Sequence, residues 1–228
     1  MVGCRLSTGP RLKVRGSLLA ALLVLSAAHV HAGSAPYASL YRALEPGLKL
    51  DRYDRLLAVQ RIQSKLAEVQ PGTITVRILA QSGAIDVPIG ADGRMRFPLT
   101  RELLTENPVV ESNQPSGSLS LSVSFEVAPP ASSTLAYTDF LDSVRQAQDA
   151  LRQLDGPYAK AEVVGLEFRM GEPDASATVE CPDSEDLLRA DQKGRIVVRI
   201  DPRLPPADTT IHFSAAPRQA FPNLRMPP

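Results

Sequence analysis

The chain has 228 residues, which is enough for one domain or two small ones. Its 25 basic and 25 acidic residues balance, and this argues against a general nucleic-acid-binding protein, because such proteins carry a basic excess or stripe. Apolar residues make up 43% of the chain and charged residues 22%, which are ordinary globular values and exclude global disorder.

The first 32 residues have the pattern of a secretory signal peptide. Four basic residues precede an apolar run at residues 18–25, and small residues at Val30 and Ala32 mark a cleavage site after Ala32. The alternative is a membrane anchor, but a spanning helix needs about 20 apolar residues, roughly twice this run. We therefore predict a periplasmic or secreted protein with no transmembrane segment after cleavage.

Cleavage would remove four basic residues and no acidic one, so 21 basic and 25 acidic residues would remain. Cys181 and His212 would be the last cysteine and histidine. An intramolecular disulfide is then impossible, and a zinc site would lack most of the three or four ligands that it needs. The composition therefore predicts no metal site and no cofactor.

The remaining residues still allow a catalytic Cys–His pair, with Cys181 as nucleophile and His212 as base. However, carboxylates at Glu180 and Asp183 would raise the pKa of the thiol and oppose its activation. We interpret Cys181 as a structural or tolerated thiol.

An internal repeat is predicted from two segments that match at an offset of 85, residues 54–66 and 139–151. Their apolar residues are spaced by three and four, which predicts amphipathic helices at 54–69 and 139–154. The apolar face of the first would hold Leu56, Val59, Ile62 and Leu66, and that of the second Leu141, Val144, Ala147 and Leu151. The alternative is that two unrelated amphipathic helices align by accident.

β-rich segments follow each predicted helix in the same order, at 73–79, 85–89 and 95–97 and again at 161–168, 177–181 and 196–200. Hairpin turns at Gly93 and Gly194 would start equivalent strands. The arginines that follow, Arg94 and Arg195, are interpreted as solvated charges at strand edges.

An insertion at residues 182–190 of the second copy predicts a short helix, with Asp183 as N-cap and Asp186 at the third position. The acidic cluster of Glu180, Asp183, Glu185 and Asp186 has neither the spacing nor the glycine of a calcium loop. We interpret these carboxylates as helix-capping groups.

The predicted fold class is α+β, with two similar units that each pack a helix on an antiparallel β-sheet. The predicted organisation is a signal peptide at 1–32, a first unit at 33–128, a linker at 129–135, a second unit at 136–216 and a proline-rich tail at 217–228. The tail is expected to be extended or disordered because it holds few apolar residues.

Residues 118–127 alternate without a fault between polar and apolar side chains. This period predicts an antiparallel strand with one buried and one wet face. The row of serines on the second face could bind a ligand through its hydroxyl groups. We favour a solvated face, because hydroxyls without aromatic or charged neighbours contribute little binding energy.

Residues 88–119 resemble an uncharacterised family of secreted bacterial proteins. The resemblance implies no activity, because none is assigned to that family. The residues that carry it are Pro88, Ile89, Asp92, Gly93, Arg94, Pro98, Leu99, Glu106, Asn107, Pro108, Ser112, Asn113, Gln114, Pro115, Gly117, Ser118 and Leu119.

No phosphate-binding loop, Gly-x-Ser-x-Gly or Ser-x-x-Lys motif occurs in the sequence. We therefore predict a non-catalytic binding or assembly module of the bacterial envelope, whose partner would be another envelope protein and not a nucleic acid. No catalytic, cofactor-binding or metal-binding residue is assigned, and the ligand-binding residues and oligomeric state stay open. The alternative is a periplasmic hydrolase with a carboxylate pair.

Overall fold

The computed structural model describes residues 33–153 and 160–226, which form two compact units. The N-terminal unit consists of 33–52 and Leu57–Phe125. The C-terminal unit consists of Tyr53–Leu56 and the described residues from Glu126 onward. The predicted signal peptide lies outside the described residues. No helix in the described part of the chain is long and apolar enough to cross a membrane.

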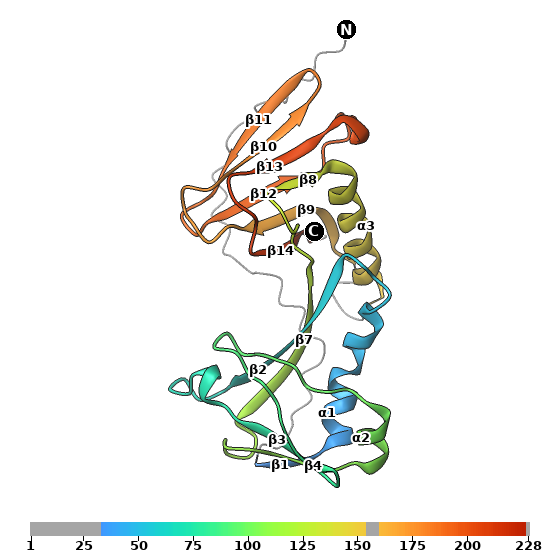
Figure 1. Cartoon of the computed structure of the whole chain (residues 1–228), viewed down its shortest axis with the longest axis vertical. Helices are drawn as coiled ribbons and strands as arrows, with labels where there is room; N and C mark the ends of the chain where they lie inside the picture. Colours follow the sequence, from blue (N-terminus) through green and yellow to red (C-terminus); the bar gives the residue numbers. More distant parts are fainter. Residues whose placement is uncertain (1–32, 154–159, 227–228) are drawn as a thin grey trace. The chain divides into compact units, whose positions relative to one another are not determined.

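The N-terminal unit is a small antiparallel sheet with helices beside it (Figure 1). Four of its strands form a sheet in the order β1-β6-β3-β4, and β7, β2 and β5 are neighbours in a second sheet. Its elements are β1 (Ser34–Pro36), α1 (Tyr37–Leu44), the 3-10 helix η1 (Glu45–Leu50), β2 (Leu56–Ser64), η2 (Pro71–Thr73), β3 (Val76–Ala80), β4 (Gly83–Asp86), β5 (Arg94–Met95), α2 (Arg101–Glu106), β6 (Val109–Ser112) and β7 (Leu119–Val127).

The core of the N-terminal unit is organised around Tyr37, the first residue of α1. Its ring is fully buried and stacks on Phe97 with centroids 5.3 Å apart. Its hydroxyl donates to the carbonyl of Pro98 and accepts the backbone N–H of Thr100. Burial raises the pKa of Tyr37. This residue therefore ties the start of α1 to the segment after β5.

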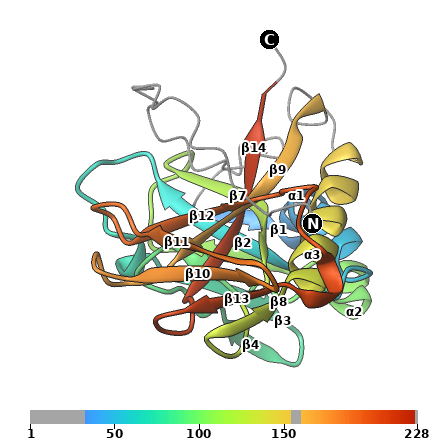
Figure 2. The same cartoon turned by 90° about the horizontal axis from the view of Figure 1, so that it is seen from above.

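The C-terminal unit has more sheet and one longer helix (Figure 2). One sheet has the order β8-β13-β10-β11, and β12, β9 and β14 are neighbours in the other. Its elements are β8 (Thr134–Ala136), α3 (Tyr137–Arg152), β9 (Glu162–Arg169), β10 (Ser176–Cys181), β11 (Ser184–Arg189), β12 (Arg195–Arg199), the 3-10 helix η4 (Pro206–Asp208), β13 (Thr210–Phe213) and β14 (Gln219–Arg225).

Helix α3 confirms the helix predicted at 139–154 as far as the described residues reach, although it begins two residues earlier. Val144, Ala147 and Leu151 are buried as predicted. Phe140 is fully buried while Leu141 is only partly buried, so the buried stripe includes the neighbour of the expected residue. The helix contacts β9, whose Val163, Leu166 and Phe168 are buried.

The helix predicted at 54–69 is wrong, because this stretch contains strand β2. Val59 and Ile62 are both buried although they are three positions apart, which places them on opposite faces of the strand. A strand that buries both faces in turn reproduces the spacing of three that an amphipathic helix shows. The repeat at an offset of 85 is therefore wrong as well, since it pairs a strand with a helix.

Two other segments also differ from the prediction. Residues 182–190 contain strand β11 and not a capped helix, because Pro182 and Asp183 form the turn of a hairpin whose strands pair from Cys181 and Ser184 onward. The predicted tail at 217–228 contains β14, which pairs along β9. Its proline, Pro222, is accommodated within that strand.

The strands predicted after each helix are confirmed as β3, β4, β5, β9, β10 and β12, with shifted ends. Overall, the chain is a mixed α/β protein that is mostly sheet.

Candidate functional site

A groove of about 450 Å³ lies in the C-terminal unit, beside β11 and β12. The two strands lie next to each other (Figure 2). One side of the groove is apolar and is formed by Val179 of β10 and Leu188 of β11. Between them projects Asp186, which lies opposite Val179 in the strand pair. The other side is formed by residues 197–204, which run from β12 into the following loop.

The far end of the groove is held by ion pairing. Arg203 contacts both carboxylate oxygens of Asp201, at 2.9 and 2.7 Å, and this hydrogen bonding lowers the pKa of Asp201. The backbone N–H of Asp201 donates to the hydroxyl of Tyr137 at 2.9 Å. Burial raises the pKa of Tyr137. These three residues therefore form a satisfied network that shapes the groove.

Asp186 differs from these residues in having no partner. Among the described residues, its carboxylate makes no hydrogen bond and no ion pair. The side chain is half-buried and faces the apolar side of the groove. A partly desolvated carboxylate without a cation favours a positively charged group beside it. The groove thus offers an apolar surface with the unpaired carboxylate of Asp186 on the β11 side, and Arg199 lines it on the β12 side.

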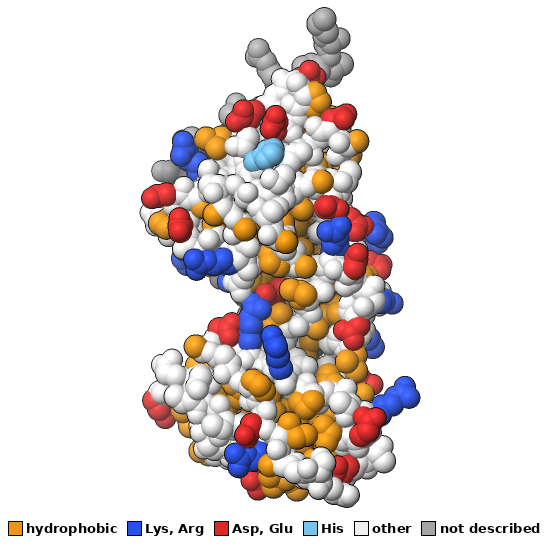
Figure 3. Space-filling view, viewed as in Figure 1, with side chains coloured by type: hydrophobic (Ala, Val, Ile, Leu, Met, Phe, Trp, Pro, Cys, Tyr) orange, Lys and Arg blue, Asp and Glu red, His pale blue; other side chains and the backbone are white. Residues whose placement is uncertain are grey.

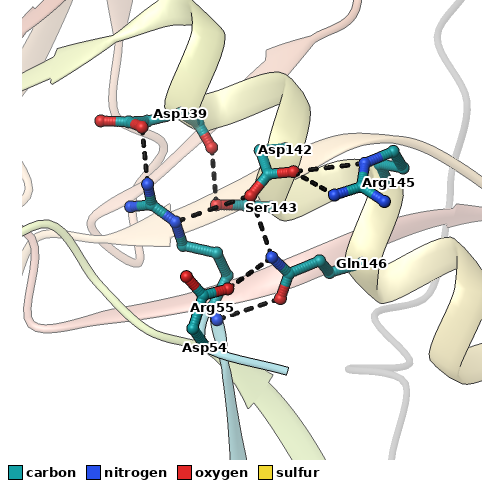
Figure 4. Close-up of polar contacts among 7 residues, drawn as sticks. All are labelled: Asp54, Arg55, Asp139, Asp142, Ser143, Arg145 and Gln146. Carbon is teal, nitrogen blue, oxygen red and sulfur yellow. Dashed lines mark hydrogen bonds and ion pairs between the residues drawn. The ribbon is translucent and has the colours of Figure 1, made fainter. Parts of the chain in front are cut away.

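A second polar cluster joins α3 to the segment Tyr53–Leu56 (Figure 4). Arg55 donates to the carboxylate of Asp139 at 2.6 Å and lies 3.8 Å from that of Asp142. The amide of Gln146 donates to Asp54 at 2.6 Å and accepts the backbone N–H of Arg55 at 3.0 Å. The cluster therefore fixes both the side chains and the backbone of this segment on the helix.

The same cluster contains the closest approach to a catalytic carboxylate pair, since Asp139 and Asp142 flank one guanidinium group (Figure 4). A carboxyl that acts as general acid needs a raised pKa. The pKa of Asp142 is lowered instead, mainly by its hydrogen bonds with Arg145. The arrangement stabilises the ionised carboxylate and suits a structural clamp better than proton transfer.

The structure separates the two residues of the Cys–His alternative. Cys181 is buried, and its sulfur lies 3.2 Å from the hydroxyl of Ser184. His212 lies opposite Thr178 on the exposed face of the same sheet and contacts Glu180 at 3.3 Å. Thiol and imidazole therefore lie on opposite faces of the sheet and cannot exchange a proton directly.

The acidic cluster is divided in the same way. Glu180 and Glu185 are direct cross-strand neighbours on the exposed face, whereas Asp186 points to the groove side. In Figure 3, acidic side chains gather near the histidine on the exposed surface of this unit. Among the described residues, no group of three or more acidic, histidine and cysteine side chains has the geometry to hold a metal ion.

Strand β7 confirms the strand predicted at 118–127, but the prediction that its serine face is solvated is wrong in part. Ser118, Ser124 and Glu126 are buried, because both faces of this strand are covered along much of its length. The hydroxyl of Ser124 accepts a long hydrogen bond from Arg61 at 3.4 Å. The serines therefore serve packing at these positions.

The two arginines that follow the turn glycines are less solvated than expected. Arg195 is 16% exposed and forms ion pairs with Asp191 and Glu167. Arg94 is 33% exposed and pairs with Asp92. Each arginine thus fastens its own hairpin turn.

Residue types alone do not indicate Tyr137, Asp201 and Arg203 as groove residues, because they become neighbours only when α3 and the loop after β12 meet. The sequence predicts a different role for Asp186, as a helix-capping residue. The turn-forming pair Pro182 and Asp183 is the feature of the sequence that could have indicated a hairpin at this point.

No known protein family model, curated protein or solved structure matches this chain.

Proposed function

We propose that this protein is an exported, non-catalytic binding or assembly module of the bacterial envelope, built from two copies of one unit. The observation that carries the functional part is the groove beside β11 and β12, which is open, apolar on one side and lined by the uncompensated carboxylate of Asp186. Binding sites commonly combine an apolar surface with a few polar groups in this way.

The proposal of two copies is supported by strand order. Each unit runs along the chain as a strand, a helix and six further strands, from β1 to β7 and from β8 to β14. The order β1-β6-β3-β4 in one sheet corresponds position by position to β8-β13-β10-β11 in the other. The remaining strands correspond as β5-β2-β7 and β12-β9-β14.

Matching hydrogen bonds support the same proposal. The N–H of Thr100 donates to the hydroxyl of Tyr37, and the N–H of Asp201 donates to the hydroxyl of Tyr137. In each unit the tyrosine is the first residue of the helix, α1 or α3. The repeat that we infer therefore has an offset of 100 to 101 residues, in place of the 85 suggested by the helix pattern.

The turn glycines agree with this offset. Gly93 and Gly194 both have positive φ, at 78° and 68°, and each precedes an edge strand. The carbonyl of Gly93 accepts the N–H of Ile62, and that of Gly194 accepts the N–H of Met170, both at 2.9 Å. Ile62 and Met170 are 108 residues apart, so the offset is larger between β2 and β9 than between the two turns.

A hydrolase with a carboxylate pair receives less support. The carboxyl groups with a shifted pKa in the described part of the chain are Asp142, Asp191 and Asp201, and in each the pKa is lowered. Ion-paired carboxylates of this kind hold loops and helices in place.

The function is tested by site-specific photo-crosslinking in the producing cell. A photoreactive residue would replace Val197, which lines the groove and is 37% exposed, and a matched control would replace Leu66 of the N-terminal unit, which is also 37% exposed. We expect a discrete crosslinked envelope protein from position 197 only, and a mature N-terminus at Gly33. Recovery of the intact chain from the cytosol, or no crosslink from either position, would contradict the proposal.

A further inference from the structure

The groove of the C-terminal unit occupies a place that the N-terminal unit fills with side chains. This comparison rests on the two-copy proposal above. In the N-terminal unit Ile85 lies opposite Ile78 and packs on the core. In the C-terminal unit the corresponding pair is Asp186 opposite Val179. A carboxylate thus stands where the other unit has an apolar side chain.

A second difference lies at the same place. Phe97 stacks on Tyr37 in the N-terminal unit, and Val198 occupies the corresponding position 101 residues further along the chain. Tyr137 stacks instead on Phe140 of its own helix, with centroids 5.1 Å apart, so β12 contributes a smaller side chain here than the segment after β5 does. The loop after β12 also lacks a counterpart to α2, since only the short η4 follows it. The groove is therefore a local departure from the common unit and not a by-product of the fold.

The walls of the groove suit an extended chain. Val197, Val198 and Arg199 line it consecutively, so the edge of β12 faces the groove, because alternate residues of a strand point to opposite faces. Within the described residues, β11 pairs only with β10, and β12 pairs only with β9. Strand edges of this kind can accept an added strand through main-chain hydrogen bonds.

The charges select the side chains of that added strand. Arg203 is already paired with Asp201, and Arg199, which lines the groove on the β12 side, forms no ion pair with Asp186 among the described residues. Asp186 lies opposite Val179 and shares a face of β11 with Leu188, and these two apolar residues would contact apolar side chains of a ligand. A basic side chain between apolar ones would therefore match the groove in both charge and spacing.

We propose that the groove beside β11 and β12 binds an extended peptide segment of a partner protein, with apolar side chains on the surface formed by Val179 and Leu188 and a lysine or arginine against Asp186.

The test uses the purified full-length protein and two fluorescein-labelled hexapeptides, Val-Thr-Lys-Thr-Val-Thr and the same peptide with glutamate in place of lysine, because alternate residues of an extended chain share a face. Fluorescence anisotropy should show saturable binding of the lysine peptide and weaker binding of the glutamate peptide. Asp186→Asn should weaken binding of the lysine peptide by about tenfold and leave the glutamate peptide unweakened. The control is Glu185→Gln, which removes a neighbouring charge from the opposite face and should change neither affinity.

Equal binding of both peptides, equal effects of Asp186→Asn and Glu185→Gln, or no saturable binding would each overturn the proposal. Thermal melting of both variants checks that the fold is retained, and a variant with a lowered melting temperature is replaced by Asp186→Ile, which introduces the side chain of the corresponding position in the other unit. If the crosslink from position 197 persists in Asp186→Asn while the peptides fail to bind, the peptide assignment fails and the binding function stands.

Discussion

The imidazole of His212 and the thiol of Cys181 lie on opposite faces of the sheet that contains β10 and β13. His212 is the cross-strand neighbour of Thr178, and Cys181 lies three positions after Thr178, so the side chains of His212 and Cys181 cannot share a face. His212 is 46% exposed at its side chain, whereas Cys181 belongs to the buried core. A nucleophile and base pair is excluded by geometry.

Cys181→Ser should therefore preserve the fold and the binding of any partner. We expect a loss of about 1–2 kcal/mol in the free energy of unfolding, because a hydroxyl is less well accommodated than a thiol in a buried position. Chemical denaturation measures the stability, and the photo-crosslink from position 197 measures function. Loss of the crosslink with an unchanged unfolding curve would contradict this prediction.

The clamp between α3 and Tyr53–Leu56 should make stability depend on pH at the acidic end. The pKa of Asp142 is lowered from 3.8 in the folded state, chiefly by Arg145. Its contribution is therefore fully present above the unfolded pKa and is lost as pH falls from about 4 through the folded pKa. Arg145→Met should reduce the slope of melting temperature against pH below 4 and leave it unchanged near pH 7.

A matched control for this prediction is Arg77→Met. Arg77 pairs with Asp86 at 2.7 Å, but the side chain of Asp86 is 77% exposed, whereas that of Asp142 is 33% exposed. Solvent screens such a pair, so its removal should change the acidic slope less. A larger effect at Arg77 than at Arg145 would show that the clamp does not govern acid stability.

Gly93→Ala should destabilise the protein more than Gly117→Ala. Both glycines have positive φ, at 78° and 77°, so both variants carry the strain of a left-handed backbone, on the order of 1 kcal/mol or more. An added Cβ at Gly93 would also lie 2.5 Å from the carbonyl oxygen of Ile62, whereas nothing lies within 4 Å at Gly117. The difference between the two melting temperatures isolates this steric clash, and equal losses would refute it.

Phe140→Ala should cost about 3–5 kcal/mol of unfolding free energy, because it empties a fully buried aromatic site. Leu141→Ala should cost clearly less, since Leu141 is only partly buried. Denaturant unfolding of the two single variants measures both values. The helix pattern in the sequence places Leu141 on the buried face and so predicts the larger loss for Leu141→Ala. This pair of adjacent substitutions therefore distinguishes the sequence-based prediction from the structure of α3.

Several features of this protein were determined by local sequence. The strict alternation at 118–127 can satisfy only a strand, and the stretch around Val144, Ala147 and Leu151 keeps its apolar side chains on one helical face. Gly93 and Gly194 were predictable as turn residues, because each needs a backbone conformation that other residues adopt only with strain. In these cases a single short-range preference agreed with the final environment.

Tertiary structure decided the rest. The segment from Leu56 to Ile62 carries apolar residues at a spacing that fits a helix, yet it forms a strand because burial on both faces and pairing with neighbouring strands outweigh the local pattern. Asp186 was visible in the sequence only as one of several acidic residues. Asp186 lies on the groove side, opposite Val179, and forms no ion pair among the described residues. This position follows from the register of β10 and β11 and from the packing beside them, which no local pattern encodes.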